Sequence, residues 1–218
     1  MGVELRPSFS EYYERPLYRI LFRWIDYRKL AVIRHALATL HSNAQLIDVG
    51  CGSGQILARV ARAGDLACAV DRDLRLLHAA GRRGLQPVRT DFDLQLPFAD
   101  ESFDAALMID TIEHAVEPRR ALEDVRRILR PGGIVVVFTP PYDSVRWILA
   151  ERLHRLVTRR QADHISPFTR ESLLWAMSSC FEELRIGRVN GKLSMYAIGR
   201  KAGVTDGAPK ARARGGGR

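Results

Sequence analysis

Cysteine is scarce in this chain, and a long apolar run is absent. The three cysteines, Cys51, Cys68 and Cys180, are odd in number and form no Cys-x-x-Cys pair. A disulfide framework is therefore not expected, and neither is a metal site. No stretch reaches the roughly 18 uninterrupted apolar residues that a membrane-spanning helix needs. The opening residues, MGVELRPSFSEYYERP, lack the apolar region of a secretory signal. The sequence predicts a cytoplasmic protein.

Acidic residues are fewer than basic residues in this chain. The chain holds 34 Lys and Arg against 25 Asp and Glu, which gives a formal net charge of +9. Most basic residues are arginines spread among acids, and a Gly- and Ala-rich tail, residues 201–218, carries several more. We predict that this tail is disordered. Two interpretations of the charge stay open: a solvated surface, or a surface for an anionic partner such as lipid headgroups or nucleic acid.

Short apolar runs alternate with amphipathic stretches from about residue 45 to residue 138. This alternation indicates an α/β fold with a doubly wound, Rossmann-like parallel sheet. Further on, the dipeptide Asn190-Gly191 separates two strand-like runs and predicts an antiparallel hairpin. The predicted strands are 45–49, 66–70, 86–89, 102–109, 133–138, 181–189 and 193–200, and the predicted helices between them are 54–63, 73–81 and 119–129.

The chain length of 218 residues suits one domain with helical additions. Residues 1–43 are expected to form an N-terminal helical cap. Residues 44–200 form the main domain, and a helical lid is inserted at about 144–168.

The stretch LIDVGCGSGQIL, residues 46–57, lies where the first predicted strand passes into the first helix. Open parallel sheets bind ligands at this edge, outside the carboxyl ends of their strands. Glycines at 50, 52 and 54 allow a sharp turn and close approach of the backbone to a ligand. A glycine pattern of this kind is shared by several nucleotide-binding folds, so it does not identify the ligand by itself.

Four carboxylates are expected at the same edge. Asp48 lies within the glycine stretch, and Asp71, Asp91 and Asp110 each follow one of the next three strands. Asp71 is placed to accept ribose hydroxyls. Several acids in one partly desolvated cleft would repel a pyrophosphate. They favour a cationic ligand that carries an ammonium group and a ribose, such as S-adenosylmethionine, over NAD.

Several segments together resemble the class I S-adenosylmethionine-dependent methyltransferases, in particular the small-molecule branch that includes the ubiquinone-type enzymes. The segments are LIDVGCGSGQIL, AVDRD, TDFDLQLPFADESFDAALMIDTIEHAVEPRRALEDVRRILRPGGIVVVFTPP and DHISPFTRESL, and the similarity extends over about residues 44–200. The resemblance implies a seven-stranded sheet whose last strand is antiparallel, with residues 44–200 as the domain that binds S-adenosylmethionine.

The resemblance also implies roles for individual residues. Asp48 and the loop backbone would hold the methionine end of the cofactor, Asp71 the ribose, and Asp91 with Phe92 the adenine. Asp110 would lie near the methionine amine. Arg72 departs from the family, which usually has an apolar residue against the adenine at that position. The complete predicted cofactor set is Asp48, Gly50, Cys51, Gly52, Gly54, Asp71, Arg72, Asp91, Phe92 and Asp110.

The methyl acceptor is less well defined by the sequence. Two histidines, His114 in IEHA and His164 in DHISPF, are the candidates for a catalytic base, because neutral imidazole can take a proton from a hydroxyl group. Both have structural alternatives in loop packing. The segment TPPY at 139–142 resembles a motif of enzymes that methylate nucleobase amines, but it follows the fifth predicted strand and lacks the polar residue in front. We therefore predict that its prolines shape the exit of that strand.

A basic amphipathic helix is predicted at 144–161. Its apolar stripe could pack on the domain as a lid, or it could face a membrane. In the second case 144–160 would make a peripheral membrane contact, and the acceptor would be lipid-like. The stripe consists of Val145, Ile148, Leu149, Leu153, Leu156 and Val157, with Trp147 alongside.

The favoured interpretation is an S-adenosylmethionine-dependent methyltransferase that acts on a small or lipid-like molecule, at oxygen. The alternatives are a protein that binds or modifies nucleic acid, and a catalytically inactive protein that binds the cofactor. The sequence leaves the oligomeric state undetermined.

Overall fold

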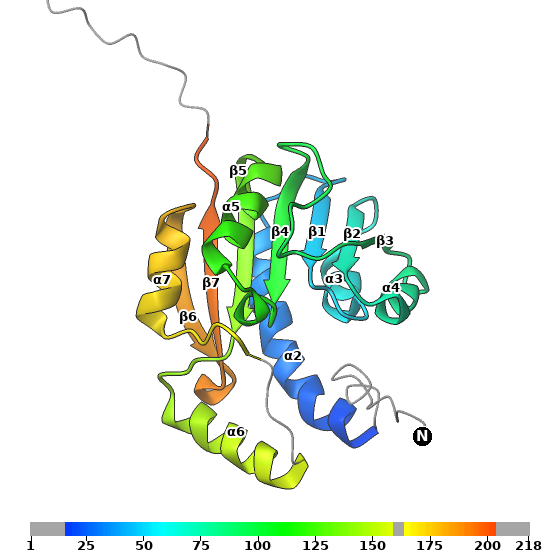
Figure 1. The fold of residues 1–218 in the computed structure, drawn as a ribbon. Coiled ribbons are helices and arrows are strands. Elements are labelled where there is room, and N and C mark those ends of the chain that lie inside the picture. Colours follow the sequence, from blue (N-terminus) through cyan, green and yellow to red (C-terminus); the bar gives the residue numbers. More distant parts are fainter. Residues whose placement is uncertain (1–15, 159–163, 204–218) are drawn as a thin grey trace, which may run out of the picture.

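The computed structural model describes residues 16–158 and 164–203 (Figure 1). Parts of the predicted cap, lid and tail, namely residues 1–15, 159–163 and 204–218, lie outside the described residues. The helices are α2 (Pro16–Leu37), α3 (Gln55–Val60), α4 (Leu74–Gly81), α5 (Pro118–Ile128), α6 (Val145–Thr158) and α7 (Arg170–Ser178), with short 3-10 turns η1 (Ile112–His114) and η2 (Asn190–Lys192). The strands are β1 (Gln45–Val49), β2 (Leu66–Asp71), β3 (Gln86–Arg89), β4 (Phe103–Ile109), β5 (Leu129–Thr139), β6 (Glu182–Val189) and β7 (Ser194–Arg200).

The strands form one seven-stranded sheet in the order β3-β2-β1-β4-β5-β7-β6. The strands β1 to β5 pair in parallel, whereas β7 is antiparallel to both β5 and β6. The predicted fold class is therefore confirmed. At the hairpin turn, Asn190 and Gly191 have φ values of 56° and 65°. Left-handed backbone at both positions is what Asn-Gly accommodates in a tight hairpin.

Successive residues of the central strands enter opposite faces of the sheet. In β1, Leu46 packs with α2 and α3, whereas its neighbour Ile47 packs with α5 and α7. Strands that are apolar on both faces are covered by helices on both sides, as Figure 1 shows. One face buries Ile33 of α2, and the other buries Leu173 of α7.

Local sequence signals account for several helix boundaries. Pro118 begins α5 in the first turn, where its missing N–H costs no hydrogen bond. Thr169 and Ser172 form a reciprocal capping box at the start of α7. The segment Arg130–Gly133, just after α5, is part of β5, and the pairing of β4 with β5 shifts register there.

Helix α6, within the segment predicted to be a lid, lies beyond the carboxyl ends of the parallel strands, at the bottom of the molecule in Figure 1. It is attached to the hairpin turn, because the Ser144 hydroxyl donates to the carbonyl of Lys192 (2.9 Å) and Arg146 donates to that of Gly191 (3.3 Å). Among the described helices, none has the length and apolar character needed to cross a membrane.

Candidate functional site

The strand order reverses between β1 and β4, so the chain leaves these two neighbouring strands toward opposite sides. Crevices at such a reversal are the usual ligand sites of open α/β sheets. The glycine loop follows β1, and the turn η1 follows β4. Both lie at the carboxyl edge of the sheet.

The glycine loop is held by the backbone of β2. The N–H groups of Gly50 and Cys51 both donate to the carbonyl of Val70, at 2.8 and 2.9 Å. Gly50, Gly52 and Gly54 all have left-handed backbone, with φ values of 75°, 54° and 72°. Only glycine adopts this conformation without strain.

The three glycines serve different purposes. A Cβ on Gly50 would meet Thr111 at 2.3 Å, and one on Gly54 would meet Leu85 at 2.4 Å. These two positions therefore need glycine for packing within the protein. A Cβ on Gly52 would meet nothing within 4 Å. The backbone of Gly52 borders open space, where a ligand can approach it.

Asp71 supports the loop from the end of β2. One of its oxygens accepts from the N–H of Gly52 and the other from the N–H of Asp73, both at 2.9 Å. Burial raises the pKa of Asp71 above its ordinary value, although these two N–H groups act in the opposite direction. The predicted ribose-binding residue thus lies directly against the glycine loop.

Asp48 is the buried acid of the site. It is 2% exposed, and its Oδ1 has no hydrogen-bond partner among the described residues. Burial raises its pKa to about 7, and the nearby charge of Asp71 adds to the effect. A buried, unpaired carboxylate is costly unless a cation or a donor compensates it.

The other predicted cofactor residues are distributed along the edge. Asp91 accepts from the N–H of Asp93 (3.0 Å), and Asp93 in turn accepts from the N–H of Val116 (2.9 Å). Phe92 is partly buried against the α5 and α7 side of the core. Arg72 is exposed. The structure brings Asp48, Asp71 and the loop into one group, whereas Asp91 stabilises its own turn.

Asp110 has a partner that sequence reasoning missed. Lys29 of α2 forms an ion pair with its carboxylate and also lies over the Phe138 ring at 5.6 Å. The Lys29 residue is only 5% exposed. Because Lys29 is 81 positions away in the chain, no local pattern indicates this contact. One of the four acids is therefore already compensated by the protein.

A second group of side chains lies between η1 and the segment after α6. The rings of His114 and His164 are 5.0 Å apart, and the Tyr142 hydroxyl is 2.5 Å from Nδ1 of His164. Trp147 of α6 stacks toward the His164 ring at 6.5 Å. The two histidines predicted as candidate bases are thus neighbours. No sequence pattern indicated that Tyr142 and Trp147 lie beside them.

Glu113 underlies this group and is fully buried. Neither of its carboxylate oxygens has a hydrogen-bond partner among the described residues. Burial raises its pKa to about 8, and the Asp110 charge contributes. Its carbonyl accepts from the N–H groups of Ile165 and Ser166, both at 2.9 Å, which joins the segment after α6 to η1.

Glu113, His114 and His164 each offer a ligand atom, and these atoms lie within 4.8 Å of one another. No metal site was expected from the sequence, which has no ligand spacing of this kind.

Cys51 faces its own loop. Its thiol donates to the carbonyl of Gly52 at 3.2 Å, and burial raises its pKa well above the ordinary range. A thiol that stays protonated is a poor nucleophile. Cys51 therefore contributes packing and backbone to the loop rather than reactivity.

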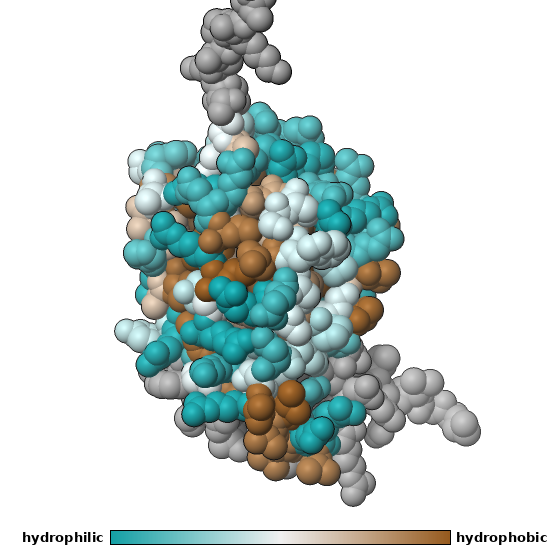
Figure 2. All heavy atoms as spheres, turned by 90° about the vertical axis from the view of Figure 1, so that its left-hand side faces the viewer, coloured by the Kyte–Doolittle hydropathy of each residue, from teal (hydrophilic) through white to brown (hydrophobic). Residues whose placement is uncertain are grey.

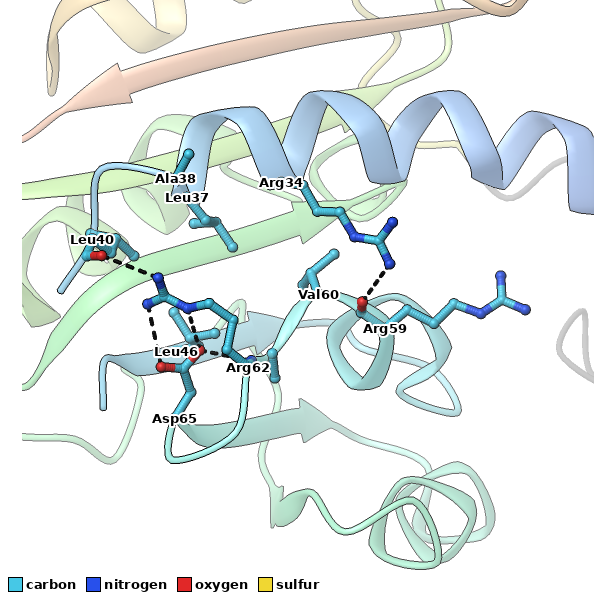
Figure 3. Close-up of a pocket in the computed structure, with 10 residues that line it drawn as sticks. Arg34, Leu37, Ala38, Leu40, Leu46, Arg59, Val60, Arg62 and Asp65 are labelled. Carbon is cyan, nitrogen blue, oxygen red and sulfur yellow. Dashed lines mark hydrogen bonds and ion pairs between the residues drawn. The ribbon is translucent and has the colours of Figure 1, made fainter. Parts of the chain in front are cut away.

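A cavity of about 300 Å³ lies elsewhere, between α2 and the end of α3 (Figure 3). Arg62 spans it and binds the carbonyls of Leu40 and His41 together with Asp65. Arg34 donates to the carbonyl of Arg59 across the other end. This cavity lies at the amino-terminal edge of the sheet, so it is separate from the glycine loop.

The chain is similar in sequence to known methyltransferases. A family profile described as "Methyltransferase domain" matches residues 47–137. The chain is 30% identical over 165 residues to a ubiquinone biosynthesis O-methyltransferase of Xanthomonas oryzae, which covers 70% of this chain and 67% of the relative. It is 34% identical over 109 residues to a demethylmenaquinone methyltransferase of Clavibacter sepedonicus, covering 47% of this chain and 44% of the relative.

A solved S-adenosylmethionine-dependent methyltransferase of Thermotoga maritima shares the fold, with a TM-score of 0.65 and 22% identity over 88% of this chain and 99% of that one. The chain spans less than half of the length of several curated relatives that it matches, between 37% and 49%. The match to the Xanthomonas relative nevertheless extends over most of both proteins. The chain therefore belongs to the S-adenosylmethionine-dependent methyltransferases.

Proposed function

We propose that this chain binds S-adenosylmethionine at the edge formed by the glycine loop and transfers its methyl group to the oxygen of a small or lipid-like acceptor. The observation that carries the proposal is that two features lie close together in the sequence, at Asp48 and at Gly52. Asp48 is a buried carboxylate with an unpartnered oxygen, and Gly52 opens onto free space in the same loop. Together they place a buried carboxylate beside backbone that a ligand can approach.

Charge supports this cofactor over a dinucleotide. Asp48 and Asp71 interact repulsively in the folded chain. A pyrophosphate would add negative charge beside them, whereas the sulfonium and ammonium groups of S-adenosylmethionine would compensate them. Lys29 already compensates Asp110, so the uncompensated negative charge lies mainly on Asp48 and Asp71.

Each predicted residue has a place in the proposed site. Asp48 and the backbone of the glycine loop would hold the methionine end, and Asp71 the ribose. Asp91 and Phe92 would lie at the adenine, with the exposed Arg72 nearby. When bound, the sulfonium supplies a methyl group that is already activated for transfer. The protein then mainly aligns the acceptor and removes a proton.

The side chains around His164 support an acceptor that carries a hydroxyl group. His164 is oriented by Tyr142, and His114 lies against it, so an imidazole at this position can take a hydroxyl proton. Trp147 provides a flat apolar wall. A demethylmenaquinone methyltransferase and a ubiquinone biosynthesis O-methyltransferase are among the relatives of this chain. An aromatic ring that bears a hydroxyl group fits both observations.

The outer face of α6 supports a lipid-like acceptor. Four of its apolar residues are 60–78% exposed, and they recur at helical spacing on one side. These four residues are too exposed to pack on the domain, so we propose a lid role only for the inner face, which carries Trp147. Figure 2 shows apolar side chains gathered at the bottom of the molecule, where α6 lies. The four residues are Val145, Leu149, Leu153 and Leu156.

Two arginines flank this exposed stripe. At 100° per residue, Arg146 and Arg152 lie on either side of the arc that the four apolar residues occupy. An apolar face with basic flanks suits the interface of an anionic bilayer. We include peripheral membrane contact through α6 in the proposal.

The activity is tested by transfer of the labelled methyl group from S-adenosylmethionine to a panel of quinols, catechols and isoprenylated phenols. Label in the organic phase supports the proposal, and mass spectrometry identifies the methylated oxygen. Cofactor binding without transfer to any acceptor would support the inactive alternative. Label in added RNA or DNA would support the nucleic-acid alternative.

Membrane contact is tested by cosedimentation with vesicles that contain anionic phosphatidylglycerol. The double variant Leu149→Glu/Leu153→Glu is expected to lose at least tenfold in binding. The control is Leu66→Glu, because Leu66 is 47% exposed at the opposite edge of the sheet. Equal loss in both variants, or equal binding by both, would contradict a role for α6.

A further inference from the structure

We propose that Glu113, His114 and His164 bind a divalent transition-metal ion, with these three side chains as its protein ligands. Glu113 and His114 belong to η1 after β4, and His164 follows α6. One ligand atom from each lies within 4.8 Å of the others. Two ligands held about 2.1 Å from one ion are roughly 3.5–4.2 Å apart, so only a small contraction of the cluster is needed.

Glu113 provides an independent reason to expect a cation. The residue is 0% exposed, and neither Oε1 nor Oε2 has a partner among the described residues. Buried carboxylates are normally hydrogen-bonded, ion-paired or bound to metal. Lys29, the nearby buried cation, is engaged by Asp110. A metal ion would satisfy Glu113.

The histidines are held in place by further contacts. The Tyr142 hydroxyl is 2.5 Å from Nδ1 of His164, so this contact holds the ring by one nitrogen, and an ion would be bound through the other nitrogen, Nε2. A hydrogen bond at the second ring nitrogen is characteristic of metal-bound histidine, because it selects the tautomer and orients the ring. The N–H groups of Ile165 and Ser166 both donate to the carbonyl of Glu113 and tie the two segments together.

The type of ligand indicates the class of ion. Imidazole suits zinc, iron, nickel and copper better than magnesium or calcium, which prefer oxygen ligands. Three protein ligands leave at least one position open, as in catalytic rather than structural sites. An ion here would lie beside Trp147 and the end of β4. If the proposed function holds, an ion here would bind the acceptor hydroxyl at its open position and lower the pKa of that hydroxyl. The proton would then pass to water, and the histidines would act as metal ligands in place of bases.

The test measures metal binding without turnover. The full chain is stripped with chelator and titrated calorimetrically with Zn²⁺, Mn²⁺ and Mg²⁺, and Co²⁺ is added as a spectroscopic probe. We expect one Zn²⁺ per chain, weaker Mn²⁺ and Mg²⁺ binding, and visible Co²⁺ bands that report nitrogen ligands. Glu113→Gln and His164→Ala should each weaken binding at least tenfold. Tyr142→Phe should weaken it to a lesser extent.

His78→Ala is the matched control, because His78 is an exposed histidine on α4 and should leave metal affinity unchanged. Circular dichroism checks that each variant is folded. Since His164 lies in a loop at the surface edge, its variant tests the site even where Glu113→Gln destabilises the core. Absence of stoichiometric binding, or equal binding by the native chain and His164→Ala, would overturn the proposal. S-adenosylmethionine binding is measured on the same samples, so failure of the metal site and failure of the proposed function are distinguished.

Discussion

The proposed site has two halves, a proposed donor half and a proposed acceptor half, and they are built in different ways. In the donor half, consisting of the glycine loop, Asp48 and Asp71, the loop is held mainly by backbone contacts between adjacent strands. The acceptor half consists of Glu113, His114, Tyr142, Trp147 and His164. It is assembled from side chains of segments up to about fifty residues apart. A local motif can therefore specify the first half, whereas only the folded chain assembles the second.

The halves also differ in how they treat buried charge. In the donor half, backbone N–H groups donate hydrogen bonds to both carboxylate oxygens of Asp71. One carboxylate oxygen of Asp48 has no hydrogen-bond partner among the described residues. In the acceptor half, both oxygens of Glu113 lack a partner in the described part of the chain. Each half thus contains one buried carboxylate whose charge a bound cation would compensate. We propose that the cofactor is the cation beside Asp48 and that a metal ion is the cation beside Glu113.

The largest expected effect concerns Asp48 and pH. Burial raises its folded pKa to about 7 from 3.8, so the folded protein retains a proton that the unfolded chain has lost between about pH 4 and pH 7. Stability should therefore fall as pH rises through this window, by up to about 4 kcal/mol, and level off above it. Asp48→Asn should remove this part of the pH dependence and weaken S-adenosylmethionine binding. Urea unfolding from pH 4 to 8 measures the first effect. An unchanged pH slope in the variant would contradict the assignment.

The next effect separates two glycines of the loop. Gly50→Ala combines a left-handed φ with a clash against Thr111, and strain plus overpacking should cost about 3 kcal/mol of folding free energy. Gly52→Ala is the control for packing, because its Cβ would have open space and only the backbone strain of about 1–2 kcal/mol remains. Gly52→Ala should nevertheless reduce cofactor affinity at least tenfold. Thermal unfolding and calorimetry measure both. Equal affinity in Gly52→Ala and the native chain would place the ligand elsewhere.

Asp71→Ala tests the ribose contact. Removal of its carboxylate should weaken S-adenosylmethionine binding by roughly 1–3 kcal/mol, or about 5- to 150-fold, because hydrogen-bond partners are left unpaired. Asp73→Ala is the matched control in the same turn. Asp73 caps α4 through the N–H of Arg75, so its loss should cost about 1 kcal/mol of stability and leave affinity unchanged. The same affinity in Asp71→Ala and the native chain would contradict the assignment.

The smallest effect on the cofactor is expected from the acceptor half. Trp147→Ala removes a half-buried ring that contacts Tyr142 and His164. Cofactor affinity should stay within twofold of the native value, while methyl transfer to an aromatic acceptor falls at least tenfold. Calorimetry and the transfer assay separate the two. A parallel loss of both would show that the halves are not independent.

The predictability of each feature follows from the range of its contacts. The alternation of apolar runs with amphipathic stretches was sufficient to predict the sheet, and Asn190-Gly191 was sufficient to predict the hairpin. Both signals come from residues that are near neighbours in the chain. The glycine loop was predicted for the same reason. The ion pair of Lys29 with Asp110, however, joins α2 to the end of β4, and no periodicity indicates it.

Helix α6 shows a second limit of prediction from the sequence. An apolar stripe in the sequence predicts that a helix has an apolar face but does not say whether that face is covered. In α6 the inner face carries Trp147, and the outer face leaves Leu149, Leu153 and Leu156 exposed. The position of Tyr142 was missed because the two prolines before it were interpreted only as a strand exit. Its backbone N–H donates to the carbonyl of Phe168, which brings the Tyr142 ring next to His164.

The central claim is that the edge around Gly52, Asp48 and Asp71 binds S-adenosylmethionine. Isothermal titration of the full chain with S-adenosylmethionine, with NAD as the competing ligand, tests it most directly. The account predicts one S-adenosylmethionine per chain, no measurable NAD binding, and a loss of affinity in Asp71→Ala. Binding of NAD in preference to S-adenosylmethionine would contradict the account.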